Sequence, residues 1–110
     1  MDLIGAEQEA DKILEEVNGY KRWCYRRFAL EKLIPFFESH GIRVAPAEDS
    51  ISIERDLDAE EILKITFKKD GTILGETIKR SNGETFIELN PIRDLLVWLF
   101  MGTAPIVEAS

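Results

Sequence analysis

The chain has 110 residues, of which 45% are hydrophobic and 32% are charged, and its formal net charge is −7. This length predicts a single domain spanning residues 1–110, and the hydrophobic content excludes a disordered chain. The acidic balance disfavours a polyanionic partner, because the net charge repels a polyanion at long range.

The first predicted element is an amphipathic helix near the start of the chain. Asn18-Gly19 interrupts its pattern, and this pair either ends the helix or kinks a longer one. A two-residue connection between antiparallel helices would be very tight, so we expect a kink. The apolar residues recur at alternating spacings of three and four and form one seam: Leu3, Ala6, Ala10, Ile13, Val17, Tyr20 and Cys24.

The helical pattern continues from Tyr20 to His40 with two apolar sides. We expect Pro35 to bend the final turns and Gly41 to end the helix. Cys24, the only cysteine, lies among apolar positions, so we expect it to be packed in the core. One apolar side consists of Trp23, Leu30, Leu33, Ile34 and Phe37, and the other of Cys24 and Phe28.

After Gly41 the apolar period changes to two, which predicts β-strands. Asp70-Gly71 and Asn82-Gly83 are hairpin signals that link strands near residues 62–68, 72–79 and 84–89. Asp58 followed by Glu61 leaves open a short helical turn before the 62–68 strand. Alternating apolar residues define the earlier strands and one face of the sheet: Ile42, Val44, Ile51, Ile53, Leu63, Ile65 and Phe67.

A C-terminal helix is predicted to begin at Asn90-Pro91, with Asn90 as N-cap and Pro91 as first helical residue. The run from Leu95 to Val107 contains thirteen residues without a charge. As a helix it would span only about 20 Å, against roughly 30 Å for a bilayer core. Because Gly102 and Pro105 also interrupt the run, we expect no transmembrane helix.

The apolar side chains of this helix point in every direction, so no single face of a small domain is expected to cover them all. We therefore expect a partner to bury part of the helix, in the first instance a second copy of the chain. The candidate interface residues are Leu95, Leu96, Trp98, Leu99, Phe100 and Met101.

Together these elements predict an α+β fold. It comprises a kinked N-terminal helical segment, an antiparallel β-meander of four to five strands and a C-terminal apolar helix. The helices are expected to pack on one face of the sheet.

A basic stretch interleaved with aromatic residues offers candidate nucleic-acid contacts at Lys21, Arg22, Arg26 and Arg27. Helical geometry places Arg22 beside Arg26 but displaces the other two side chains by about 100° or more. The further basic pairs at 68–69 and 79–80 fall at opposite ends of a meander. The pattern therefore does not favour nucleic acid as a partner.

No catalytic, cofactor-binding or metal-binding residues are predicted, and we expect no cofactor. The acidic residues Asp56, Asp58, Glu60 and Glu61 imitate the opening of a calcium loop. However, the sixth and twelfth positions counted from Asp56 are Glu61 and Phe67, where an EF-hand needs Gly and Glu, so we expect a solvated acidic turn.

His40 is the only histidine and is expected to cap helix carbonyls. A catalytic pair with Cys24 is excluded on a continuous helix, because sixteen residues of helix separate the two by about 24 Å.

The leading hypothesis is a non-enzymatic protein-interaction module that acts as a homodimer, in which the N-terminal seam and the C-terminal helix meet the partner. One alternative is a nucleic-acid-associated regulator that uses residues 20–27. Another is a small-ligand-binding domain with a pocket between helices and sheet. The chain start lacks the basic segment and apolar stretch of a secretory signal, which predicts a cytoplasmic protein.

Overall fold

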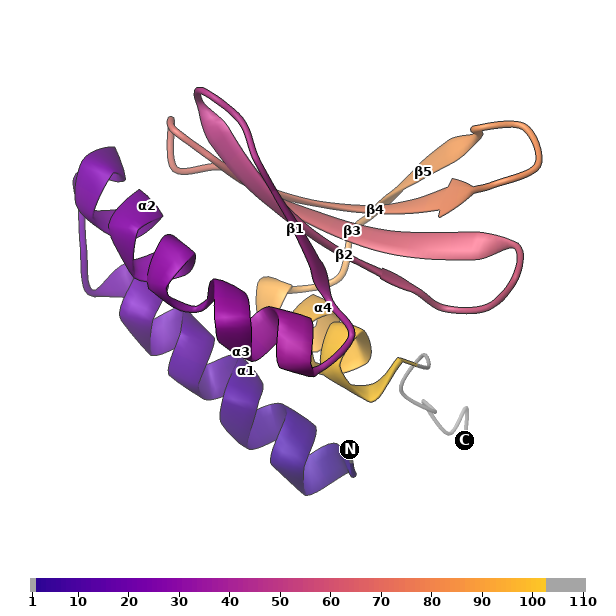
Figure 1. Ribbon diagram of the computed structural model, residues 1–110, viewed down its shortest axis with the longest axis horizontal. Coiled ribbons are helices and arrows are strands. Elements are labelled where there is room, and N and C mark those ends of the chain that lie inside the picture. Colours follow the sequence, from indigo (N-terminus) through magenta and orange to yellow (C-terminus); the bar gives the residue numbers. More distant parts are fainter. Residues whose placement is uncertain (1, 103–110) are drawn as a thin grey trace.

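Five antiparallel strands form one sheet, and the helices lie on one of its faces (Figure 1). The structure is a computed structural model that describes residues 2–102. The strand order β1-β2-β3-β4-β5 is that of a meander, which confirms the predicted α+β fold. The elements are α1 (Leu3–Asn18), α2 (Trp23–Lys32), α3 (Ile34–Ser39), β1 (Arg43–Pro46), β2 (Ser50–Asp56), β3 (Glu61–Lys68), β4 (Ile73–Lys79), β5 (Thr85–Glu88) and α4 (Ile92–Met101).

The chain reverses where the sequence analysis expected a kink. Asp2 caps α1 by accepting a hydrogen bond from the Gly5 N–H (2.7 Å), and the helix ends at Asn18. Residues 19–22 then connect it to α2, which packs beside α1 (Figure 1). The reversal is possible because the connection uses four residues rather than the two of Asn18-Gly19.

A kink does occur further along, at Leu33. The last turn of α2 ends there, and α3 begins with Pro35 in its first turn. Proline lacks an N–H and clashes with the preceding turn of a continuous helix, which explains the break. The helix stops at Gly41, as expected: the Ile42 and Gly41 N–H groups donate to Phe37 and Glu38 carbonyls, each at 3.0 Å.

The sheet turns follow the predicted signals. Gly71 (φ 92°) and Gly83 (φ 69°) both have the positive φ that favours glycine. The alternative of a helical turn at Asp58 is not adopted. Its carboxylate instead accepts hydrogen bonds from the Glu60 and Glu61 N–H groups (2.7 and 2.8 Å), in a turn between β2 and β3.

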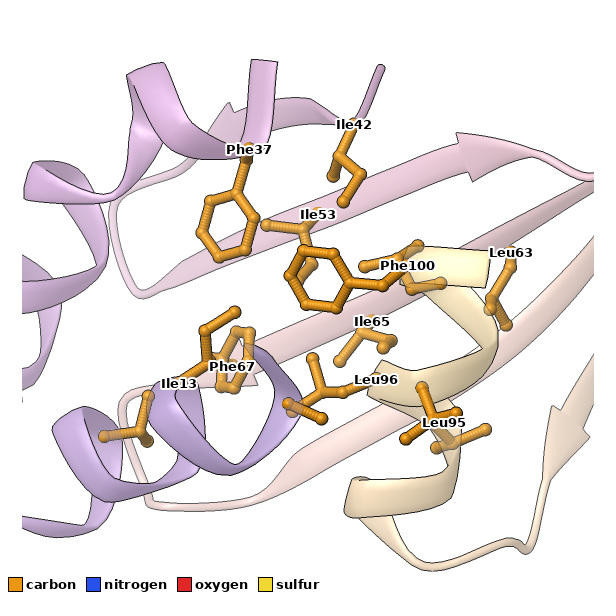
Figure 2. Packing of buried hydrophobic residues seen from close by; sticks show 14 of the residues in the cluster. Ile13, Phe37, Ile42, Ile53, Leu63, Ile65, Phe67, Leu95, Leu96 and Phe100 are labelled. Carbon is orange, nitrogen blue, oxygen red and sulfur yellow. The ribbon is translucent and has the colours of Figure 1, made fainter. Parts of the chain in front are cut away.

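Most of helix α4 is covered within the chain by several elements together, where the sequence pattern predicts that no single face would cover it all. The sheet lies on one side of it, α1 packs against it, and α3 lies beside it on the same face of the sheet (Figures 1 and 2). Phe100 contacts the rings of Phe36 and Phe37, with centroids 5.8 and 6.4 Å apart. Most of the helix is apolar because these elements cover it on several sides, while Trp98 and Met101 stay half-buried. Its buried residues are Leu95, Leu96, Val97, Leu99 and Phe100.

The N-terminal seam and the C-terminal helix, both expected to meet a partner, pack against each other. The small residues Ala6 and Ala10 are fully buried on α1, the helix that packs against α4. Arg93 of α4 donates to Asp11 (2.7 Å) and Glu7 (3.0 Å) of α1 at the edge of this contact. The two elements therefore satisfy each other's apolar surface.

The start of α4 differs from the prediction by one residue. Pro91 is the N-cap residue, with extended backbone angles (φ −55°, ψ 147°), and α4 begins at Ile92 without a side-chain cap. Asn90 therefore does not cap the helix. The part of the predicted apolar run from Thr103 to Val107, including Pro105, lies outside the described residues. None of the helices between residues 2 and 102 combines the length and apolar character needed to cross a bilayer.

Candidate functional site

Four of the six candidate interface residues on α4 belong to the core of the chain. Leu95, Leu96, Leu99 and Phe100 are each at most 3% exposed, so α1, α3 and the sheet already occupy the place expected for a partner. The other two, Trp98 and Met101, are only half-buried. Of the six candidates, only Trp98 and Met101 therefore have side-chain surface that a partner could contact.

The basic candidates are partly used inside the chain. Arg27 pairs with Glu31 (Nε to Oε1, 2.9 Å) and donates through Nη1 to the carbonyls of Ala47 and Glu48, which fastens α2 to the β1–β2 turn. Arg26 is half-buried beside the β3–β4 turn, where its Nη1 is the nearest neighbour of a Cβ built on Gly71.

Lys21 and Arg22, the other two basic candidates, are exposed at the start of α2. The structure thus gives two of the four candidates a role in packing helices onto hairpin turns. The predicted separation of the other basic pairs also holds: Lys68-Lys69 and Lys79-Arg80 lie at opposite ends of β4.

The acidic turn is held by arginines and backbone. Asp56 pairs with Arg43 (2.8 Å) and with Arg80, and these two guanidinium groups hold the pKa of its carboxyl below the ordinary range. Asp58 caps its own turn. Between residues 2 and 102, no group of three or more metal-binding side chains is placed to hold a metal ion.

His40 takes the predicted capping position, with Nδ1 2.9 Å from the Phe36 carbonyl oxygen. Cys24, by contrast, is exposed, so the prediction that it packs in the core is wrong. The seam that led to Cys24 presumed one continuous helix. Because the chain reverses after Asn18, Cys24 and Phe28 lie on the outer side of α2.

One group of exposed apolar side chains lies between α1 and α2. Tyr20, Tyr25 and Phe28 are 45–58% exposed and line a groove of about 550 Å³. The two tyrosine rings are 6.2 Å apart, and the Lys32 ammonium lies 4.5 Å from the centre of the Phe28 ring. A cation of the chain itself therefore already covers part of this groove.

The second group lies on and just after the last strand. Phe86, Ile87 and Leu89 are 45%, 63% and 93% exposed. Ile87 is opposite Glu76 on the sheet face that the helices leave uncovered, whereas Phe86 is opposite Thr77 on the helix side. Sequence analysis assigned this strand but did not single out its exposure. The available signal was its place as the last strand of a meander, which makes it an edge.

The two edges of the sheet differ in protection. Strand β1 ends in Pro46, which has no N–H, and α3 packs beside this strand. Arg43 of β1 is held by Glu54 (3.0 Å) and Asp56. Strand β5 has neither lysine nor proline and pairs only with β4 among the described residues. Lysine and proline are among the features with which natural proteins block edge strands, so β5 lacks two protections, although like β1 it is only four residues long.

The hydrogen-bond pattern shows which backbone groups this edge presents. The Lys79 N–H donates to the Glu84 carbonyl at 2.8 Å, so 79 and 84 form a hydrogen-bonded pair. In an antiparallel ladder such pairs alternate, so Phe86 and Glu88 bond to β4. Thr85 and Ile87 therefore direct their N–H and C=O groups outward.

Two charged side chains flank these backbone groups on the helix side of the sheet. The Lys79 ammonium lies 5.6 Å from the centre of the Phe86 ring. The Glu88 carboxylate accepts a hydrogen bond from Thr77 Oγ1 (3.1 Å). The edge thus combines outward polar backbone, exposed apolar side chains and charges of both signs, a combination suited to adding a strand.

Comparisons of the chain with protein-family models, curated proteins and solved structures found no match. The chain's own surface is therefore what points to a function.

Proposed function

We propose that the protein is a non-enzymatic protein-interaction module that acts as a homodimer, and that the open edge of β5 is the surface through which it associates. The observation that carries this proposal is an edge strand whose outward backbone groups have no partner among residues 2–102, together with exposed Ile87 and Leu89. The cytoplasmic location expected from the sequence is part of the same proposal.

Strand addition would satisfy both needs of this edge. It supplies partners for the outward N–H and C=O groups, each hydrogen bond contributing about 0.5–1.5 kcal/mol net. It also removes aliphatic surface from water, and burying a side chain such as Ile87 fully contributes about 1.5–3 kcal/mol. These contributions must offset the free-energy cost of the translational and rotational freedom lost on association. A partner with a matching strand is needed to supply them.

The proposal is tested by light scattering on two matched lysine variants. Ile87→Lys places a charge on the β5 edge, and Ile4→Lys places one at a comparably exposed position of α1 (63% and 69% exposed). We expect the unaltered chain and Ile4→Lys to have about twice the 12.6 kDa chain mass, and Ile87→Lys to have the mass of one chain. Urea unfolding checks that both variants remain folded. An unaltered chain that stays monomeric at hundreds of micromolar would overturn the proposal.

Contacts within the chain already use part of the surface that each of the two alternatives would need. The basic stretch offers fewer phosphate contacts than its sequence suggests, since Arg27 is held by Glu31 and two carbonyls. In the groove between α1 and α2, the Lys32 ammonium already lies over the Phe28 ring, 4.5 Å from its centre.

A further inference from the structure

The backbone of β5 limits how a second copy can pair with it, if the proposed function holds. Consider a two-fold axis perpendicular to the sheet, which joins two sheets with all helices on the same face. Rotation about this axis leaves each side chain on the same face of the joined sheet, and residues that lie opposite each other in a ladder must share a face. The axis therefore passes beside one residue of β5, which then lies opposite its own copy. The possible central residues are Thr85, Phe86, Ile87 and Glu88.

Charge and turn geometry exclude three of these centres. An axis at Glu88 sets two Glu88 carboxylates against each other, and an axis at Phe86 sets Glu84 against Glu88 of the second copy. Like charges directly opposite each other are destabilising. An axis at Thr85 brings Gly83, which has φ 69° and lies in the β4–β5 turn, opposite Ile87 of the second copy. The Gly83 N–H already donates to the Lys79 carbonyl (2.8 Å), so Gly83 cannot donate it to Ile87 of the second copy.

The remaining centre, Ile87, matches apolar and charged groups. Ile87 meets its own copy, and because its N–H and C=O point outward the two form a hydrogen-bonded pair. Thr85 lies opposite Leu89 of the second copy. Phe86 lies opposite Glu88 of the second copy, and the Lys79 ammonium already sits 5.6 Å from the centre of the Phe86 ring. The Glu88 carboxylate of each copy therefore approaches the Lys79 ammonium of the other copy, and symmetry gives two such contacts.

We infer that two copies of the chain pair antiparallel through β5 with the two-fold axis at Ile87, joining the two five-stranded sheets into one. Ion pairs between Lys79 and Glu88 of the second copy flank the axis. This inference rests on the proposed function. It adds the register in which the two β5 strands pair and the residues that select a second copy as the partner.

Disulfide trapping tests the register. Ile87→Cys is made in a Cys24→Ser background, because the native cysteine is exposed and would itself cross-link. Opposed residues of a hydrogen-bonded pair have Cα atoms about 5.5 Å apart, within disulfide range. Mild oxidation should then convert most of this variant into a covalent dimer on a non-reducing gel.

Phe86→Cys in the same background is the matched control. In the inferred register residue 86 of one copy lies opposite residue 88 of the other. The Cα atoms of the two residues 86 are therefore about 8 Å apart, which is beyond disulfide range. We therefore expect little cross-linking. Efficient cross-linking of Phe86→Cys, or none at Ile87→Cys while light scattering still shows a dimer, would overturn the register. A monomeric unaltered chain would instead contradict the proposed function.

Charge exchange tests the ion pairs independently. Lys79→Glu and Glu88→Lys should each raise the dimer dissociation constant by about tenfold, and the double variant should return to within about threefold of the unaltered chain. Lys69→Glu, at the opposite end of β4, should leave the constant unchanged. Equal and additive weakening by the two single variants, without recovery in the double variant, would overturn the inferred contact.

Discussion

A methyl group of Leu95 lies over Gly75 so closely that a Cβ built on Gly75 would overlap Leu95 Cδ1. Gly75 is buried in β4, between Ile65 of β3 and Glu88 of β5. The missing side chain lets α4 rest directly on the sheet, where Leu95 fills the space. A glycine inside a strand is otherwise unfavourable, so its place here is explained by this close approach.

Gly75→Ala should destabilise the fold by about 1–3 kcal/mol, because the added methyl group overpacks a full core. Leu95→Ala alone should cost about 2–5 kcal/mol by leaving a cavity. Combined, the two changes should cost less than their sum, since the smaller side chain at 95 makes room for the methyl at 75. Urea unfolding of the three variants measures this coupling, and strict additivity would show that the two positions do not touch.

Gly71→Val and Gly83→Val should each destabilise the fold by roughly 1 kcal/mol or more, because a β-branched residue is strained at positive φ. A Cβ has open space at Gly83 and only an ordinary contact at Gly71, so the cost is one of backbone conformation. Gly71→Asn serves as the control, since asparagine tolerates this conformation, and it should cost less. Thermal melting of the three variants decides, and valine variants that melt like the unaltered chain would contradict the turn assignment.

Stability should fall as the pH drops below about 4. A hydrogen bond from Arg93 lowers the pKa of Asp11, and hydrogen bonds from Arg43 and Arg80 lower that of Asp56. A carboxyl with a lowered pKa in the folded state stabilises that state above its ordinary pKa, and this contribution is lost as the pH falls through the folded-state value.

Arg93→Met should therefore flatten the acid side of the stability profile, measured by urea unfolding between pH 5 and 2. Lys69→Met is the control, because Lys69 and Asp49 are both exposed and 3.9 Å apart. It should leave the profile unchanged. An unaltered acid slope in Arg93→Met would show that the contact between α1 and α4 does not depend on this pair.

Labelled DNA and RNA should show no saturable binding below about 10 μM at low salt. Any binding would therefore be weaker than that of the tighter ordinary non-specific binders. Arg27→Ala should instead lower stability, because Arg27 holds two carbonyls of the β1–β2 turn. Fluorescence titration and thermal melting separate the two effects. Submicromolar binding that weakens steeply with salt would restore the nucleic-acid hypothesis.

Local signals sufficed for the strands and their turns. Residues 63–67 alternate because the sheet has one covered face, and the Asp70-Gly71 and Asn82-Gly83 pairs mark turns that need positive φ. These features depend on neighbours in the sequence, so the order of a meander follows from them. The kink at Leu33 likewise follows from Pro35.

Features that depend on distant residues could not be obtained in this way. Phe100 is covered by α3, about sixty residues earlier in the chain. No local pattern indicates that the sheet and distant helices cover α4. Cys24 was misplaced because its burial depends on where the chain reverses. The exposure of Ile87 depends on β4 being the single neighbour of β5 within the described part of the chain, which alternation along the strand does not encode.

The contact between α1 and α4 determines when the packing of the chain can be completed during synthesis. Arg93 and Asp11 are 82 residues apart, which takes a ribosome roughly 4–16 s at 5–20 residues per second. The hairpins between them can form within microseconds of emerging. Throughout those seconds α1 has no α4 to pack against. The nascent chain therefore presents the N-terminal seam to the ribosome surface and to chaperones until its last helix emerges.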